Sequence, residues 1–479
     1  MFRVEMLFNS PQFVLLVIVT ALIYYARPFA KAQVTILTLS SFVFYAYGQP
    51  LLLLLLVISA LINGVVSYRV LNERAETERR RWATIGVVAN LTVLAFFKYN
   101  RLLAATLYSD LEAIDGVGHL LLTIPLPIGI SFYTFQGISL VVDVFREERG
   151  PEREVAITDD GLLDHLRRTV FFISFFPQLV AGPIVKAHDF FPQITRKRFG
   201  EIAWGKVSRA LILGYFLKMV IADNMQHQTF WITYPYFELY STFELCVLLF
   251  GYSMQIFADF AGYSLIAIGI AAFYGYHLPD NFNFPYISQS FSEFWRRWHI
   301  SLSTWLKTYL YVPLGGNRHG SKRTYFNLMM TMFLGGLWHG AAWSYAVWGT
   351  WHGVALALER PLLKTRIYTS THPVMIALRM LAVFVFVTMA WLLFKLPDFD
   401  HVLSYVSALV SNGARSTRLQ VVFTVACYSL PVVAYHLLYL LGRRGLTWPR
   451  RVEPALYGAL LFAICVNHGD ADAFIYFQF

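Results

Sequence analysis

The chain has 479 residues, of which 57% are hydrophobic and only 14% are charged, and its net charge is +10. Soluble domains carry roughly 25% charged residues, so this composition excludes an ordinary soluble globular protein. The apolar residues come in long runs such as LLLLLLVISALINGVVSY at 51–68. These runs approach the ~20 residues that a helix needs to cross a bilayer, whereas a membrane barrel would show alternating segments of about 10 residues.

The apolar runs predict an all-α, polytopic integral membrane protein with roughly 11–14 membrane-embedded helices. The first run lacks a strongly basic start and a small-residue cleavage site, so it is interpreted as a retained span rather than a signal peptide. No repeat or flexible linker divides the sequence, and a single domain over 1–479 is expected. In chain order the predicted spans lie near 11–26, 32–48, 50–68, 82–98, 120–144, 168–186, 205–224, 240–258, 260–276, 326–345, 345–360, 374–396, 420–441 and 455–467.

Two of the apolar segments are interrupted by residues that break helices. IPLPIGISFYTFQGISLVVDVF at 124–145 has two prolines and two glycines, and FFPQLVAGPIVKAHDFFPQI at 175–194 has three prolines. Irregular backbone at membrane depth is tolerated only where it is buried in protein or lines a cavity. These segments therefore predict re-entrant elements around a polar interior, such as a central funnel or tunnel.

Basic residues cluster between the apolar runs, at 69–81, 196–198 and 443–451. Lys and Arg stay on the cytoplasmic side of membrane proteins, so we expect cytoplasmic loops there and no nucleic-acid partner. The three cysteines each lie in an apolar run without a C-x-x-C pair. They predict neither zinc nor disulfides, and we expect small buried hydrophobic residues at Cys246, Cys427 and Cys465.

The segment at 288–323 differs from a simple span because it mixes Trp and Tyr with Arg and Lys. Phe294, Trp298 and Leu302 recur at helical spacing, with Arg296 and Arg297 elsewhere on the wheel. This pattern predicts an amphipathic helix at the membrane interface that begins near Ser292. The glycine-punctuated stretch PLGGNRHG that follows predicts a basic, turn-rich loop.

Ionisable residues inside apolar segments are functional candidates by default. Asp259 is expected to pair with Arg296, Arg297 or a protonated histidine, because an isolated buried carboxylate is costly. His352 is expected to make a satisfied tertiary hydrogen bond. The full set of candidates is Asp143, Asp259, His299, His339 and His352.

His339 is the strongest of these candidates. Imidazole titrates near ~6.5, so it can take and return a proton at neutral pH. Glycines before and after His339 would give room to another backbone or a substrate, and tryptophans would form rigid walls. These neighbours are Gly335, Gly336, Gly340, Trp338 and Trp343.

Several of these stretches resemble the membrane-bound O-acyltransferase family, in particular its bacterial polysaccharide branch, which includes enzymes of alginate O-acetylation. They include FPQLVAGPIVKAHDF, FADFAGYSLIAIG, FWRRWHISLSTWLKTYLYVPLGGNR and TMFLGGLWHGAAWSYAVWGTWHG, and the core of the resemblance covers 125–353. The resemblance implies a helical ring around a tunnel through a thinned membrane. It places the family's catalytic histidine at His339 and the second family histidine at His299.

The resemblance also implies the reaction. Family members move an acyl group from a cytoplasmic thioester toward an extracytoplasmic acceptor, often with a periplasmic esterase-like partner. We therefore expect a bacterial inner-membrane enzyme with acetyl-CoA as donor substrate, no permanently bound cofactor and no metal, working with a polysaccharide synthase or secretion complex. Residues expected to bind donor or substrate, or to line the tunnel, are Trp338, Gly336, Gly340, Asp259, Arg296 and Arg297. Arg296, Arg297, Lys307 and Arg318 could steer the polyanionic coenzyme, although positive-inside topology explains them equally well.

Two positions depart from the alginate pattern, because Leu265 and Thr308 stand where such members usually carry an acid. Alginate, cellulose or another exopolysaccharide therefore fits equally well as the acceptor. D-alanyl transfer to teichoic acids is the alternative within the enzyme class. A transporter would need two similar halves, which the sequence lacks. A non-catalytic scaffold of a secretion complex is the other alternative.

Overall fold

The computed structural model describes residues 6–107, 125–146, 157, 161–180, 182–443, 445 and 452–470. Every regular element in this described part is helical, which confirms the predicted all-α class. The backbone groups into two compact units, the first formed by 1–209 and 267–279 and the second by 210–266 and 280–479. The prediction of a single domain is not tested by this grouping.

The first unit is built on helices whose ends follow ordinary rules. Ser10 caps the first helix through its side chain, and proline opens both that helix and the third, where its missing N–H would have no partner anyway. The α-helices of this unit are α1 (Pro11–Tyr25), α2 (Gln33–Gly48), α3 (Pro50–Asn72), α4 (Glu76–Leu107), α6 (Ile130–Arg146), α7 (Leu162–Ser174), α8 (Phe176–Leu179), α9 (Ala187–Phe190) and the start of α10 (Trp204–Tyr215). Its 3₁₀ turns are Arg27–Phe29, Phe191–Gln193 and Phe199–Glu201.

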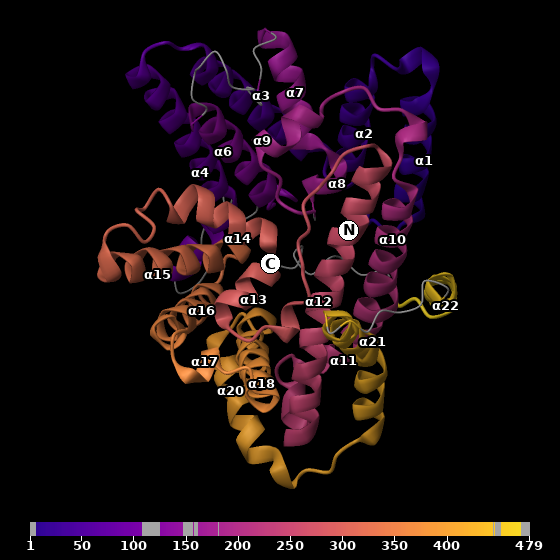
Figure 1. Ribbon diagram of the computed structural model, residues 1–479, viewed down its shortest axis with the longest axis vertical. Helices are drawn as coiled ribbons and strands as arrows, with labels where there is room; N and C mark the ends of the chain where they lie inside the picture. Colours follow the sequence, from indigo (N-terminus) through magenta and orange to yellow (C-terminus); the bar gives the residue numbers. More distant parts are fainter. Residues whose placement is uncertain are drawn as a thin grey trace. The chain divides into compact units, whose positions relative to one another are not determined.

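The second unit begins within α10, and most of its helices are labelled in Figure 1. Its helices are α11 (Asp223–Thr229), α12 (Thr242–Phe273), α13 (Phe291–Arg297), α14 (Ile300–Leu306), α15 (Gly320–His339), α16 (Trp343–Leu362), α17 (Arg366–Thr369), α18 (Pro373–Ala390), α19 (Leu392–Lys395), α20 (Phe399–Ser411), α21 (Leu419–Arg443) and α22 (Glu453–Val466). The last turns of α12 belong to the first unit. Two π-helical stretches, Phe216–Ala222 and Lys307–Tyr311, and 3₁₀ turns at Phe230–Ile232, Tyr236–Leu239, Pro285–Ile287 and Asn412–Ala414 complete the unit.

Helices α15 and α16 form an antiparallel hairpin and lie side by side (Figure 1). A Cβ atom on Gly336 would lie 2.2 Å from the carbonyl oxygen of Tyr345 and 2.9 Å from the Cα atom of Gly349. The two backbones therefore touch at a pair of glycines, as small residues allow in membrane helix packing. The close approach at Gly336 is between helices, and its lining of a substrate passage stays a prediction.

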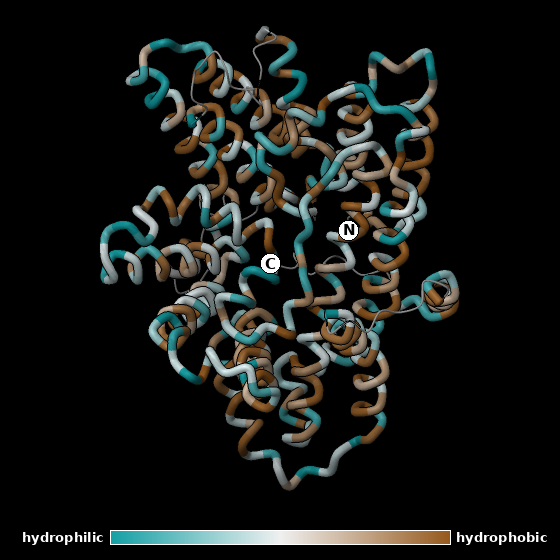
Figure 2. The backbone as a smooth tube through the Cα atoms, viewed as in Figure 1, coloured by the Kyte–Doolittle hydropathy of each residue, from teal (hydrophilic) through white to brown (hydrophobic). Residues whose placement is uncertain are grey.

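Five helices in the described ranges are long and apolar enough to cross a membrane, namely α3, residues 76–100 of α4, α12, residues 373–395 across α18 and α19, and α21. α1 and α22 are shorter and also apolar. Hydrophilic residues gather mainly in the connecting loops, whereas hydrophobic residues follow the helices (Figure 2). The polytopic membrane class is therefore supported, while the count of roughly 11–14 helices, the re-entrant segments and the funnel stay predictions.

Three expectations about local structure were wrong. The runs at 240–258 and 260–276 are one helix, α12. The amphipathic helix predicted from Ser292 starts at Phe291 and is broken at His299 into α13 and α14. All three cysteines are exposed, because an outward helix face meets lipid, and an apolar run does not imply burial in protein. The basic segment at 443–451 falls largely outside the described residues, and the sidedness of the basic loops stays a prediction.

Candidate functional site

His339 is the last residue of α15, and its ring is enclosed by aromatic side chains. It is 4% exposed, and the hairpin turn after it brings α16 back alongside. Ring centroids lie 5.0 Å from it in Trp348, 5.1 Å in Phe394 and 5.1 Å in Trp338. The fold therefore places an imidazole in a water-poor environment, as the sequence suggested.

His299 lies opposite, at the break between α13 and α14. Its ring centroid is 6.3 Å from that of His339, and it is 0% exposed. Its backbone is left-handed, with φ 45° and ψ 54°, a conformation that a non-glycine residue rarely adopts and that costs about 1–3 kcal/mol. Two histidines forty positions apart in sequence are thus brought together, one of them on a strained turn.

Asn281 holds that turn. Its carbonyl oxygen Oδ1 accepts hydrogen bonds from the backbone N–H of Ser301 (3.3 Å) and the hydroxyl of Ser301 (2.9 Å), while its Nδ2 donates to Ser264 (3.1 Å). The backbone oxygen of Asn281 also accepts from Ile300 N–H at 2.9 Å. Asn281, at 1% exposure, therefore fixes the chain that follows His299.

The same amide also fixes the tautomer of His299. Oδ1 of Asn281 lies 3.0 Å from Nδ1 of His299, and because Oδ1 only accepts, Nδ1 must carry the proton. Burial lowers the pKa of His299 to about 3, and this residue lies between two helices too short to cross a membrane. The ring is therefore neutral at pH 7, with its lone pair on Nε2. Asn281 was not among the candidate residues predicted from the sequence.

Replacing Asn281 with Ala is expected to lower acyl transfer about 10-fold or more, because each lost buried hydrogen bond is worth ~0.5–1.5 kcal/mol. Asn281→Asp keeps an acceptor for Nδ1 and is expected to retain more activity than Asn281→Ala. The control is Asn283→Ala, because Asn283 is exposed. Equal transfer by Asn281→Ala and wild-type protein, at equal amounts in the membrane, would show that the tautomer of His299 does not matter.

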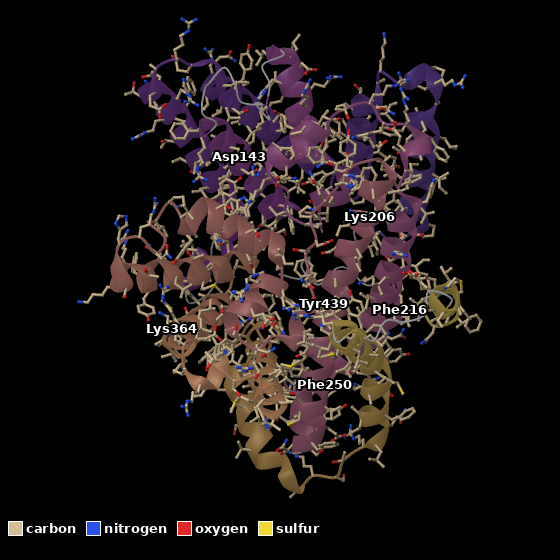
Figure 3. The ribbon with its side chains drawn as sticks, viewed as in Figure 1. Asp143, Lys206, Phe216, Phe250, Lys364 and Tyr439 are labelled. Atoms are coloured by element: carbon tan, nitrogen blue, oxygen red, sulfur yellow. The ribbon has the colours of Figure 1, made fainter. Side chains whose placement is uncertain are left out.

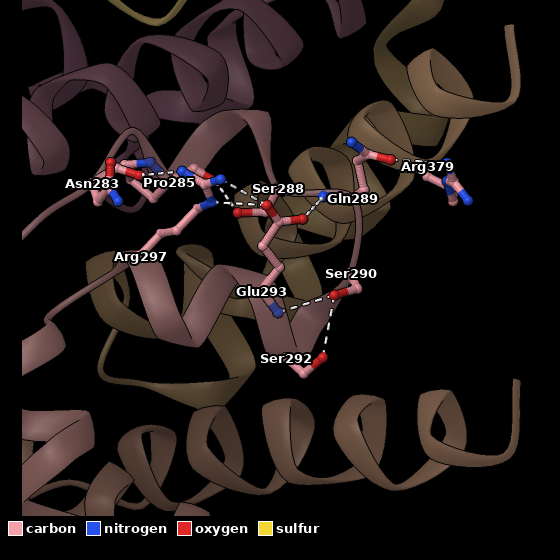
Figure 4. A network of polar contacts seen from close by, with 9 residues as sticks. All are labelled: Asn283, Pro285, Ser288, Gln289, Ser290, Ser292, Glu293, Arg297 and Arg379. Atoms are coloured by element: carbon pink, nitrogen blue, oxygen red, sulfur yellow. Dashed lines mark hydrogen bonds and ion pairs between the residues drawn. The ribbon is translucent and has the colours of Figure 1, made fainter. Parts of the chain in front are cut away.

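The start of α13 is anchored by two carboxylates. Ser290, the N-cap, accepts from the N–H of Glu293 (3.0 Å), and Glu293 accepts in return from the N–H of Gln289 (2.9 Å), the residue before the N-cap (Figure 4). This pair of bonds resembles a capping box. Glu359 of α16 is 2% exposed and accepts from the N–H groups of Phe291 (2.5 Å) and Ser292 (2.9 Å). α16 is thereby tied to the helix that leads to His299.

The two arginines proposed to bind the donor have different environments. Arg297 donates to Glu293 at 2.9 Å and to the carbonyl oxygen of Asn283 at 2.9 Å, so it holds the segment before His299 (Figure 4). Arg296 is exposed. Contact of either arginine with a donor stays a prediction.

The two tryptophans proposed as walls also differ. Trp338 is buried, and its ring centroid lies 6.0 Å from that of His299, as expected of a wall between the histidines. Trp343, in contrast, is 56% exposed. The role of Trp343 as a wall of the site stays a prediction.

Asp259 is paired with a lysine rather than with the residues that were expected. Nζ of Lys218 lies 2.8 Å from Asp259 and 2.7 Å from Asp223, and the Lys218 side chain is 2% exposed. The prediction of Arg296, Arg297 or a histidine as the partner was therefore wrong. The sequence did contain a signal, a lysine inside the apolar stretch GYFLKMVIAD at 214–223, which periodicity alone did not single out.

Asp143, another candidate, lies in the first unit (Figure 3) and forms an ion pair there. Its carboxylate lies 2.9 Å from Nδ1 of His188. The hydrogen bonds that His188 donates to Asp143, and then to Asp189, raise the pKa of His188 to about 10. His188 is therefore an imidazolium at neutral pH, and the contact is an ion pair.

His352 is 0% exposed, and neither ring nitrogen has a hydrogen-bond partner among the residues that the structure describes. The expected satisfied hydrogen bond is therefore wrong. No group of three His, Cys, Asp or Glu in the described part of the chain is arranged to hold a metal ion.

Comparison with known proteins gives the following similarities. Residues 165–399 match the model of the membrane-bound O-acyltransferase family. The chain is 35% identical to the probable alginate O-acetylase AlgI of Azotobacter vinelandii, over 88% of this chain and 83% of that protein. It is 33% identical to the peptidoglycan O-acetyltransferase of Helicobacter pylori (86% and 82%). It is also 30% identical to the teichoic acid D-alanyltransferase of Bacillus subtilis, over 48% of this chain and 58% of that protein.

Proposed function

The chain belongs to the membrane-bound O-acyltransferase family and is an O-acyltransferase, and from this premise we propose that it moves an acetyl group from a cytoplasmic thioester to a secreted polysaccharide. The single observation that supports the site best is the pairing of His299 and His339, with ring centroids 6.3 Å apart in a buried aromatic enclosure. Such a pair can serve the two proton transfers, away from the hydroxyl and onto the leaving thiolate, that acyl transfer from a thioester to a hydroxyl involves.

In the proposed reaction His339 acts as general base. The acceptor hydroxyl loses its proton to His339 as its oxygen bonds to the acyl carbon, and the bond from that carbon to sulfur breaks. The thiolate then takes that proton from His339, which leaves a free thiol, a new ester and a neutral His339. His299, with Nδ1 fixed by Asn281, would orient the donor through Nε2 in its neutral form.

Acetyl-CoA is the proposed donor, and the bacterial inner membrane is the proposed location. Relatives of this chain include proteins named for O-acetylation of alginate and of peptidoglycan, which supports a cell-surface or secreted glycan as acceptor. A periplasmic esterase-like protein that completes the transfer, and a polymer synthase beside it, are the proposed partners.

D-alanyl transfer to teichoic acids is the second candidate. It is favoured by the similarity to the Bacillus subtilis D-alanyltransferase, although that match covers about half of this chain. The alginate and peptidoglycan relatives match most of the chain, so acetyl transfer is preferred.

Deletion of the gene, with analysis of ester-linked groups released by mild base from surface glycans, tests the proposed function. Loss of acetate from one glycan, restored by the intact gene, is expected. Loss of D-alanine instead would transfer the assignment to the second candidate, and unchanged esters would contradict both.

A further inference from the structure

Four ring nitrogens, carried by Trp295 of α13 and by Trp348 and His352 of α16, lie close to one another and are unused by the proposed reaction. Among the described residues, the indole N–H groups of Trp295 and Trp348 and both nitrogens of His352 have no hydrogen-bond partner. His352 is 0% exposed and Trp348 is 1% exposed. Buried polar groups are nearly always bonded to protein or ordered water, so a cluster of unbonded groups requires an explanation.

The three rings are mutual neighbours. The centroid of His352 lies 5.2 Å from that of Trp295 and 4.7 Å from that of Trp348, and the two tryptophan rings are 5.6 Å apart. Trp348 is also 5.0 Å from His339. Trp348 thus contacts both the proposed base and the unbonded histidine.

The chemistry of these groups restricts what could bind them. An indole N–H only donates, while a neutral imidazole both donates and accepts. The two indole N–H groups therefore match the two lone pairs of one oxygen atom, and the imidazole can donate to that oxygen in place of an indole or, where the oxygen belongs to water, accept from it. The surrounding rings include Phe294 and Phe386, and an apolar enclosure disfavours an ion without a counter-charge. The ligand is therefore a small neutral oxygen acceptor.

We propose that Trp295, Trp348 and His352 bind such an oxygen beside His339, either the carbonyl oxygen of the acyl group or a water molecule. The assignment of the oxygen to an acyl group rests on the proposed function, whereas the existence of an oxygen-binding site does not. Bound there, the acyl carbonyl would be held next to the proposed base by N–H donors, and the aromatic walls would favour a short acyl chain.

Ultraviolet resonance Raman spectroscopy, which reports hydrogen bonding at indole N–H, tests the site in purified full-length protein. Difference spectra between wild type and Trp295→Phe, and between wild type and Trp348→Phe, isolate the two indoles. We expect hydrogen-bonded N–H groups. A bonded signal that requires acetyl-CoA identifies the acyl carbonyl, and one present without it identifies water. Indoles that are free or face only neighbouring rings in both conditions would overturn the proposal.

Steady-state kinetics test whether the bound oxygen is the acyl carbonyl of the donor or whether the cluster has only a structural role. If the carbonyl binds, Trp348→Phe is expected to raise the KM for acetyl-CoA about 2–10-fold with kcat little changed, the range for one hydrogen bond. The control is Trp351→Phe, on the same helix but 44% exposed. An unchanged KM would show that the acyl carbonyl oxygen does not bind to this cluster. Absence of transfer from acetyl-CoA by wild-type protein would instead overturn the proposed function, while the spectra still decide whether the oxygen site exists.

Discussion

Replacing His339 with alanine is expected to lower ester acetate on the target glycan by about 10²-fold or more, the usual contribution of a positioned general base. His339 is enclosed by the aromatic rings of Trp338, Trp348 and Phe394, so water is a poor substitute for its ring. Complementation of a deletion strain, with ester acetate measured after mild base, gives the result directly.

The matched control for this substitution is His372→Ala, because His372 is exposed. Both variants must reach the membrane in wild-type amounts, which immunoblotting of washed membranes measures. Glycan acetate above a tenth of the wild-type amount in the His339→Ala strain would remove His339 from the role of base.

Replacing Lys218 with methionine is expected to destabilise the second unit severely. Lys218 lies within 2.8 Å of both Asp223 and Asp259, and the three side chains are almost fully buried. Removing one partner of a buried ion pair costs about 3–5 kcal/mol, because the other charge is left uncompensated. Little folded protein is therefore expected in size-exclusion chromatography after detergent extraction.

A second substitution separates charge from shape at this site. In Lys218→Met both carboxylates keep their charge without a cation. Adding Asp259→Asn removes one of these two uncompensated negative charges and is expected to recover part of the folded protein. Lys364→Met serves as the control, because Lys364 is exposed (Figure 3). A normal melting temperature for Lys218→Met alone would show that the triad does not stabilise the fold.

The helices themselves were predictable because apolar runs longer than a bilayer crossing have few other solutions. Spans near 374–396 and 420–441 correspond to α18 with α19 and to α21. The break at His299 could not be predicted, because Phe294, Trp298 and Leu302 continue the helical spacing across it. The break exists because Asn281, distant in sequence, supplies the hydrogen bonds that hold a left-handed turn.

The partners of the buried charges could not be predicted from the sequence either. Asp259 was identifiable as a carboxylate in need of a cation, but Lys218 lies forty-one residues earlier on a π-helical stretch. Pairing across that separation depends on tertiary packing. His339 was identified from its own segment, whereas the unbonded nitrogens of His352, Trp295 and Trp348 become apparent only when α13 and α16 are seen together.

The central claim is that His339 is needed to move an acetyl group from a cytoplasmic donor to a glycan on the other side of the membrane. An acyl-transfer assay with the donor supplied on one known face of the membrane tests this claim most directly. Inside-out membrane vesicles from cells that make the glycan expose the cytoplasmic face, so labelled acetyl-CoA added outside supplies the donor from the proposed side. The account predicts base-labile label on polymer protected in the lumen with wild-type protein, and almost none with His339→Ala. Equal label with both proteins, or label only when acetyl-CoA is enclosed in the lumen, would contradict it.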